Sequence, residues 1–343
     1  MDRREIVRRA VEFDTPPRLP FWQAVLNDIP QDVCDCWEMD RAKRGWFFDH
    51  AGEDDWGCGW AVTETKNMGQ VVHHPLQDWA KLDSYRPPDP KDPFYFARIE
   101  ATLAGAADRY RIVTCHFNLI ERLHMLHGFA PTLADFHLEP AKLEKVLDMI
   151  LAFKIEMLRE LHHRFGDRVD AVFFTDDWGT QRGTFISRKM FDDFFRDRYR
   201  QLVQCVHDCG WHFILHSCGK VNAFVPCFID LGIDVLNLQQ PQVYGIEELG
   251  AQAAGKICFL TTADIQSTMP SGNPDRIRAE VRRLVENWST PKGGFIVFNY
   301  GFGDMIGCTP EATALMFREF EKYMCYWNTP HGLSDRRAGT VAP

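Results

Sequence analysis

Residues 211–238, WHFILHSCGKVNAFVPCFIDLGIDVLNL, contain the pattern that decides the fold. Two short apolar runs, WHFIL (211–215) and DVLNL (234–238), flank a stretch near residues 220–231 that is expected to be helical. Apolar runs without polar alternation are typical of strands buried on both faces of a parallel sheet, where helices connect one strand to the next. The segment is therefore predicted to be one strand–helix–strand unit of a parallel sheet.

The same unit recurs on both sides of this segment. The other apolar runs are RIVTC (111–115), AVFFT (171–175), KICFL (256–260) and GFIVF (294–298), and a further strand is expected near residues 18–24. Helical text lies between them, up to residue 164 and near residues 188–208, 245–253, 273–288 and 310–325. Seven or eight such units favour a closed barrel over an open doubly wound sheet, for which no GxGxxG loop follows any strand. We therefore expect an α/β fold, a single (β/α)8 TIM barrel.

The N-terminal third differs in composition. A short helix is predicted at residues 2–12, and residues 46–89 are rich in glycine, tryptophan and proline, as in DDWGCGW (54–60). Such text predicts short strands and turns, followed by a helix near residues 92–108. We expect residues 1–94 to supply an N-terminal cap beside the barrel mouth and the first elements, residues 95–327 to form the barrel core, and the polar residues 328–343 to be a tail.

Charge and cysteine content limit the class of protein. The 343 residues include 39 Lys+Arg and 48 Asp+Glu, so the net charge is −9, which argues against nucleic acid or an anionic membrane as the main partner. No hydrophobic signal core opens the chain and no apolar run has the length of a bilayer span, so a cytoplasmic protein is expected. The eleven cysteines are scattered and odd in number, which predicts mostly free thiols. The oligomeric state stays open.

Polar and ionisable residues concentrate where the predicted strands end. The segments concerned are CHFN (115–118), TDDWG (175–179), HSCGK (216–220), QQP (239–241), TTAD (261–264) and NYGFGD (299–304). In a β/α barrel the chemistry occurs at the carboxyl ends of the strands. This distribution predicts a site at one mouth of the barrel.

His216 and Cys218 are the clearest candidates for metal ligands. They are two residues apart at a strand end, so both side chains point to the same side if the strand continues. An imidazole and a thiolate together are typical zinc ligands, although the same residues could instead pack and hydrogen-bond without metal.

Acidic residues supply the candidate catalytic groups. Asp176 and Asp177 could provide a ligand or a carboxyl group with a raised pKa, and we expect one of them to cap a helix while the other faces the site. Asp55, in the similar acidic-acidic-Trp text of the cap, is a weaker candidate for the same mouth.

Taken together, these motifs resemble the uroporphyrinogen decarboxylase superfamily over roughly residues 95–325. The resemblance rests on a D-x-W-G segment at 176–179, a G-x-D-V strand at 232–235 and N-x-G-x-G at 299–303 followed by Thr309-Pro310. It implies a single β/α barrel, in agreement with the alternation of strands and helices.

The resemblance extends to two functional branches. Uroporphyrinogen decarboxylases carry an early arginine-rich segment, whereas the matching residues here, FWQAVLND (21–28), contain no arginine, and Phe302 replaces a family histidine. Decarboxylation is therefore disfavoured, since a polycarboxylate substrate would lack its cations. It stays an alternative, together with a barrel that only binds a ligand.

The second branch comprises corrinoid-dependent methyltransferases, whose zinc-containing members carry H-x-C and a distant cysteine. His216 and Cys218 match the first two ligands, but the expected third position is Phe302, so Cys308 or Asp177 would have to complete a zinc site. The resemblance implies demethylation of a small methoxylated, aromatic substrate and transfer of the methyl group to a corrinoid. No D-x-H-x-x-G text is present, so a partner protein would carry that corrinoid. The residues expected to bind substrate are the rings of Phe117, Trp178, Tyr300 and Phe302 and the amides of Asn118, Gln239 and Asn299.

Overall fold

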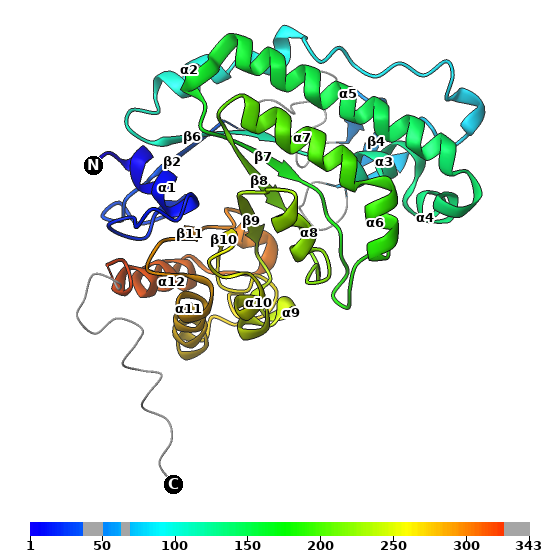
Figure 1. The fold of residues 1–343 in the computed structure, drawn as a ribbon. Helices are drawn as coiled ribbons and strands as arrows, with labels where there is room; N and C mark the ends of the chain where they lie inside the picture. The colour runs from blue at the N-terminus through cyan, green and yellow to red at the C-terminus, as the bar shows by residue number, and fades with distance from the viewer. Residues whose placement is uncertain (37–50, 63–68, 326–343) are drawn as a thin grey trace. The chain divides into compact units, whose positions relative to one another are not determined.

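A computed structural model describes residues 1–36, 51–62 and 69–325 (Figure 1). Its main sheet consists of β1 (Phe21–Trp22), β2 (Val33–Cys36), β6 (Tyr110–Cys115), β7 (Ala171–Thr175), β8 (His212–His216), β9 (Val235–Leu238), β10 (Cys258–Thr261) and β11 (Phe295–Phe298). The strand order is β1-β11-β10-β9-β8-β7-β6-β2, and β7 pairs in parallel with both β6 and β8. Eight strands in this order with helices between them confirm the predicted fold class, the (β/α)8 barrel.

The chain divides into two compact units, which are described separately. The first unit contains residues 1–34, 108–110 and those from 234 onward, and the second contains residues 35–107 and 111–233. The parts of the sequence around the H-x-C and D-x-W-G motifs therefore belong to the second unit.

The second unit has helices of 6 to 26 residues along with β6, β7 and β8. They are α3 (Leu119–His127), α4 (Phe129–Leu138), α5 (Pro140–Phe165), α6 (Arg188–Phe194), α7 (Arg196–Asp208) and α8 (Val225–Asp230), with the short α2 (Ile99–Ala104) before β6. Helices α5 and α7 lie side by side (Figure 1). Helix α5 buries a stripe of leucine, isoleucine, valine and phenylalanine and ends at Gly166, whose φ of 47° suits glycine.

The second unit also contains a small antiparallel sheet, β3-β4-β5, formed by β3 (Gly52–Glu53), β4 (Gly59–Ala61) and β5 (Gln70–His73). This segment packs on α3 and α5: the Trp56 ring lies 4.8 Å from that of Phe153, and the Cys58 thiol donates to the Met125 carbonyl at 3.4 Å. The prediction of short strands here is confirmed for the described residues. Residues 37–50 and 63–68 of the predicted N-terminal segment lie outside them, as do the tail residues 328–343.

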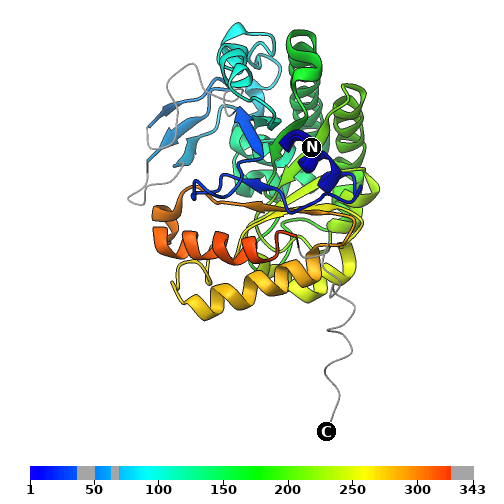
Figure 2. The ribbon, with the colours of Figure 1, turned by 90° about the vertical axis from the view of Figure 1, so that its left-hand side faces the viewer.

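The first unit places α1 (Arg3–Val11), α9 (Pro241–Tyr244), α10 (Ile246–Ala253), α11 (Pro274–Trp288) and α12 (Pro310–Lys322) around β1, β9, β10 and β11. Helices α11 and α12 run side by side (Figure 2). Asn273 caps α11 by accepting from the amides of Asp275 and Arg276, and Pro274 occupies the first helical position. None of the helices in the described ranges has the length and apolar character needed to cross a membrane.

The structure differs from the predicted elements at four places. Strand β2 was not expected, and the helical text up to residue 164 is three helices, because Gly128 at φ 101° separates α3 from α4 and Pro140 starts α5. The helix expected at 188–208 is interrupted at Phe195. The helix expected near 92–108 is reduced to a 3-10 turn at Pro93–Phe96 and to α2.

Candidate functional site

The ends of β7 and β8 bring the candidate ligands together within the second unit. The parallel register pairs Thr175 with His216, so the residues that follow each strand leave the sheet side by side. Three hydrogen bonds hold the two segments: Asp176 N donates to His216 O at 3.0 Å, Trp178 N to Ser217 Oγ at 3.0 Å and Lys220 N to Thr180 O at 2.7 Å. The two loops therefore form one rigid corner.

Two glycines allow this close approach. A Cβ atom on Gly219, whose φ is +79°, would lie 2.1 Å from the carbonyl oxygen of Gly179. A Cβ on Gly179 would in turn lie 3.0 Å from the backbone of Gly219 and Lys220. Backbone atoms cannot give way as a flexible side chain can, so the crossing of the two loops requires glycine at Gly219.

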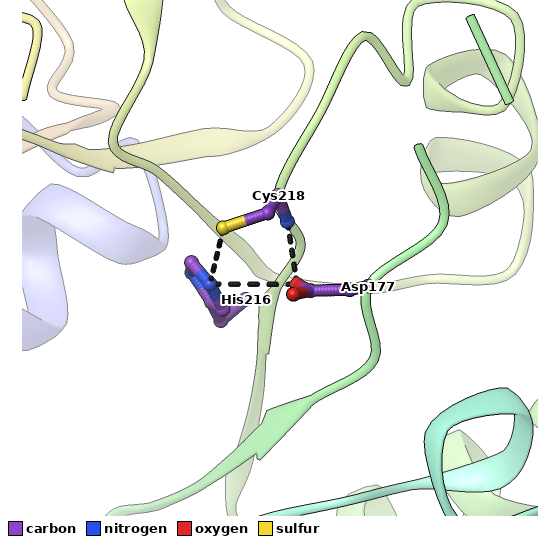
Figure 3. A group of neighbouring side chains, drawn as sticks. All are labelled: Asp177, His216 and Cys218. Atoms are coloured by element: carbon purple, nitrogen blue, oxygen red, sulfur yellow. Dashed lines mark hydrogen bonds and ion pairs between the residues drawn. The ribbon is translucent and has the colours of Figure 1, made fainter. Parts of the chain in front are cut away.

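Asp177, His216 and Cys218 converge in this corner (Figure 3). His216 Nε2 lies 3.3 Å from Cys218 Sγ and 3.6 Å from Asp177 Oδ1, and the three donor atoms all lie within 4.8 Å of one another. The amide of Cys218 also donates to Asp177 Oδ1 at 2.7 Å. The predicted common orientation of His216 and Cys218 is confirmed.

The two distances from His216 Nε2, to Cys218 Sγ and to Asp177 Oδ1, fit a transition-metal ion. Bonds of about 2.0–2.3 Å at a tetrahedral zinc place neighbouring donors roughly 3.3–3.6 Å apart. A nitrogen, a sulfur and an oxygen donor suit zinc, whereas magnesium and calcium prefer oxygen shells. The residues could therefore hold zinc and leave one position for a substrate atom.

The electrostatic surroundings favour a cation between these residues. Burial, and then the charges of Asp177 and Glu121, raise the pKa of the Cys218 thiol well above its usual range. Burial and the neighbouring Asp177 and Asp176 likewise raise the pKa of Glu121, although its Oε2 accepts a 2.6 Å hydrogen bond from Thr175. A bound dication would relieve this crowding of acidic groups, because it stabilises their charged forms.

Asp176 and Asp177 have separate roles. Asp176 is fully buried and accepts from the amides of Leu119 and Glu121 at the start of α3, at 3.2 and 2.9 Å, and from the Tyr199 hydroxyl at 2.5 Å. Burial raises its pKa to about 7 against the effect of these bonds. One aspartate thus caps a helix while Asp177 faces His216 and Cys218, as the sequence predicts.

The expected substrate residues of the second unit lie close to this corner. Phe117 adopts a positive φ of 52°, its amide donates to Thr175 Oγ1 at 2.9 Å, and its ring lies 5.7 Å from that of Trp60. A bulky residue in this conformation is strained, which is common at functional sites. Asn118 follows it and is fully buried.

Trp178 has a different place from the one expected. Its fully buried indole packs edge-on against Phe191, Phe195 and Phe224, and its Nε1 donates to the Tyr199 hydroxyl at 3.3 Å. The ring belongs to the hydrophobic core between the helices, so its contribution is to fix the backbone beside Asp177 rather than to contact a substrate.

The remaining expected residues belong to the first unit. Gln239 Nε2 donates to Asn237 Oδ1 at 2.9 Å, and the half-buried rings of Tyr300 and Phe302 meet edge-on at 5.9 Å. Cys308 is buried, with its sulfur 3.3 Å from Thr313 Oγ1. Asn299 is half-buried after β11.

In the cap segment the buried carboxylate is Asp54, the neighbour of the predicted Asp55. Asp55 accepts one hydrogen bond from the Tyr95 hydroxyl at 2.9 Å, while Asp54 forms a buried ion pair with Arg122 at 2.7 Å. Sequence reasoning missed Arg122 and Glu121. Their place in the first turn after the CHFN strand end was the available signal.

The fold and this corner define a β/α-barrel protein with a candidate metal centre. The family description "Uroporphyrinogen decarboxylase (URO-D)" matches residues 50–323. The chain belongs to this family, which confirms the resemblance inferred from the motifs.

Comparison with solved structures agrees on the fold. A methyltransferase from Methanosarcina mazei is 15% identical with a TM-score of 0.60, and the match covers 78% of this chain and 76% of that one. Xylanase 10B from Thermotoga maritima (10% identity, TM-score 0.39) matches over 94% and 98% of the two chains. D-psicose 3-epimerase from Clostridium cellulolyticum H10 (13%, 0.40) matches over 68% and 87%. The first similarity shows the fold alone, and the other two support no conclusion. No curated protein matches the sequence.

Proposed function

We propose that this chain is a methyltransferase that demethylates a small methoxylated aromatic substrate and passes the methyl group to a corrinoid carried by a partner protein. The observation that carries the proposal is the convergence of His216, Cys218 and Asp177 in one corner at the ends of β7 and β8. Family membership and the barrel shared with a protein named as a methyltransferase support it.

Zinc is the metal proposed for this corner, held by His216 Nε2, Cys218 Sγ and a carboxylate oxygen of Asp177. When bound there, zinc would act as a Lewis acid on an ether oxygen and lower the energy of the departing phenolate. Asp177 is preferred to Cys308 as third ligand because its Oδ1 already lies 3.6 Å from His216 Nε2.

The chain's own residues would position and protonate the substrate. Glu121, whose pKa is raised by burial and by the neighbouring Asp177 and Asp176, is oriented by its hydrogen bond from Thr175, so it is the better candidate for a proton donor to a phenolate. Asp176, with both oxygens engaged at the start of α3, keeps the corner in shape. Within the second unit, Phe117 is the proposed ring contact and Asn118 the proposed hydrogen-bonding residue.

A cysteine pair offers a matched test. Cys218→Ala should remove bound zinc, measured by elemental analysis of protein purified without chelators, and abolish methyl transfer from methoxyarenes to a reduced corrinoid protein. Cys308→Ala, which also deletes a buried thiol, should keep both. Full demethylation by Cys218→Ala, or loss of zinc only in Cys308→Ala, would contradict the proposal.

The family name leaves a decarboxylase as the alternative. The lack of arginine at residues 21–28 speaks against it, since β1 places the buried Phe21 and Trp22 there. We expect no conversion of uroporphyrinogen III in an anaerobic assay. Turnover of that substrate would favour the decarboxylase, and binding of methoxyarenes without turnover would favour a barrel that only binds.

A further inference from the structure

A lysine and a cysteine that are not among the proposed metal ligands lie in contact inside the second unit. Lys154 extends from α5 so that its Nζ lies 3.0 Å from the Sγ of Cys115, the last residue of β6. The same ammonium group donates to the carbonyl of His116 at 2.7 Å. Lys154 is 3% exposed and Cys115 is fully buried, so both groups are held in place by the packing around them.

The sulfur takes the place that a carboxylate usually has beside a buried lysine. Buried lysines are rare and are normally paired with an acidic group. Within the described ranges, Lys154 forms no ion pair with a carboxylate, and its Nζ also lies 5.9 Å from the ring centroid of Phe174. The sulfur of Cys115 is therefore a buried hydrogen-bond partner of the Lys154 nitrogen. Neither group has a part in the proposed methyl transfer.

We propose that Cys115 and Lys154 form a site of oxidative modification, in which a peroxide converts the pair into a covalent sulfur–nitrogen cross-link. The thiolate of Cys115 attacks hydrogen peroxide, which forms the sulfenic acid and releases one water molecule after proton transfer. The neutral amine of Lys154 then attacks the same sulfur and expels a second water. In total, RSH + R′NH2 + H2O2 gives RS–NHR′ + 2 H2O: the sulfur is oxidised by two electrons and the peroxide is reduced to water.

The geometry favours this outcome over other fates of the sulfenic acid. Sulfenic acids condense with a nearby nitrogen or thiol when one is within reach, and here the amine is already in contact with the sulfur. After the bond forms, the nitrogen keeps one hydrogen and can still donate to the carbonyl of His116. The cross-link would tie α5 to the end of β6, directly before the strained turn at Phe117.

Peptide mapping of the full chain tests the proposal. The reduced protein is treated with hydrogen peroxide, digested with trypsin and analysed by mass spectrometry. The expected result is a pair of joined peptides containing Cys115 and Lys154 whose mass is about 2 Da below the sum of the two. Cleavage after Lys154 should be lost, and dithiothreitol should restore both free peptides. A joined pair about 14 Da above the sum would place an oxygen atom between sulfur and nitrogen and would equally support the cross-link.

Two matched variants on α5 separate the cross-link from general oxidation. Lys154→Arg keeps a cation beside the His116 carbonyl but removes the amine, so Cys115 should gain about 32 or 48 Da as sulfinic or sulfonic acid. Lys145→Arg changes an exposed lysine of the same helix and should leave the cross-link intact.

The comparison is made at peptide level because a disulfide between Cys205 and Cys209 would give the same change in intact mass. Wild-type protein in which Cys115 becomes sulfinic acid while Lys154 is still cleaved would overturn the proposal. So would a Cys115 that stays reduced while the half-buried Cys205 is oxidised. Both of these results are measured on the wild-type chain, so they remain decisive even if Lys154→Arg does not fold.

Discussion

Replacing Asp54 by Asn should destabilise the second unit strongly, because Asp54 is the buried partner of a buried arginine. Its carboxylate accepts from the amides of Trp56 and Cys58 at 3.0 and 2.9 Å, from Trp60 Nε1 at 3.2 Å and from Arg122 Nη1 at 2.7 Å. Asp54 and Arg122 are 3% and 6% exposed. The pair joins the cap segment to α3.

The expected loss of unfolding free energy depends on which charged group each substitution leaves without its partner. Asp54→Asn takes this carboxylate away from a buried guanidinium group, which typically costs about 3–5 kcal/mol, and we expect about 3 kcal/mol because asparagine still accepts from the backbone amides. Arg122→Met leaves a carboxylate that keeps three N–H donors, so about 2 kcal/mol is expected. The double variant should cost about 3 kcal/mol instead of the additive sum of about 5, which is a coupling energy of about 2 kcal/mol.

The assay is urea unfolding followed by circular dichroism for the wild type, both single variants and the double variant. Asp55→Asn is the matched control, since Asp55 is half-buried and its partner in the hydrogen bond at 2.9 Å is the neutral Tyr95 hydroxyl. This variant should cost less than about 1 kcal/mol. An Asp54→Asn variant within about 1 kcal/mol of wild type, or strictly additive single changes, would refute the reasoning.

Three further predictions concern the corner formed by the loops after β7 and β8. Asp177→Asn keeps an acceptor for the Cys218 amide, so the free energy of unfolding should change by less than about 1 kcal/mol. Its zinc affinity, measured by dye competition, should fall by more than the roughly 10–100-fold that is lost when an outer-shell partner is removed. Unchanged affinity would remove Asp177 from the proposed ligands. The pKa of the Cys218 thiol is raised, so zinc must displace its proton in order to bind. Zinc affinity should therefore rise about tenfold per pH unit between pH 6 and about 8. A flat pH profile in the same competition assay would contradict this. Gly219→Ala should lower the free energy of unfolding by at least about 3 kcal/mol, since its Cβ would meet the Gly179 carbonyl. Gly183→Ala is the control and should be nearly neutral, because the space around its Cβ is open. Equal thermal stability of the two variants would show that the loop crossing is not tight.

Local patterns in the sequence were sufficient for most elements. AVFFT (171–175) is β7 with the predicted bounds, and WHFIL (211–215) differs from β8 by one residue. The common orientation of His216 and Cys218 was also predictable, because side chains two residues apart in a strand point to the same face.

The helix boundaries were harder to predict. The breaks at Gly128 and Phe195 were missed, since neither interrupts the periodic apolar pattern around it. Trp178 was expected in a substrate pocket because it follows the end of a strand. Its burial could not be predicted, since Phe191, Phe195 and Phe224 reach it only when the helices pack.

By itself the sequence determined the order of strands and helices, the family and the identity of two metal-ligand candidates, because each of these depends on residues that are near neighbours in the chain. The tertiary structure decided which groups meet. The register that pairs Thr175 with His216 places Asp177 beside His216. The position of α3 after β6 makes Asp176 the aspartate that caps a helix. Contacts such as Asp54–Arg122 and Cys115–Lys154 join residues 68 and 39 positions apart. Periodicity cannot predict such contacts, because they arise from packing between elements and from the cost of burying an unpaired charge.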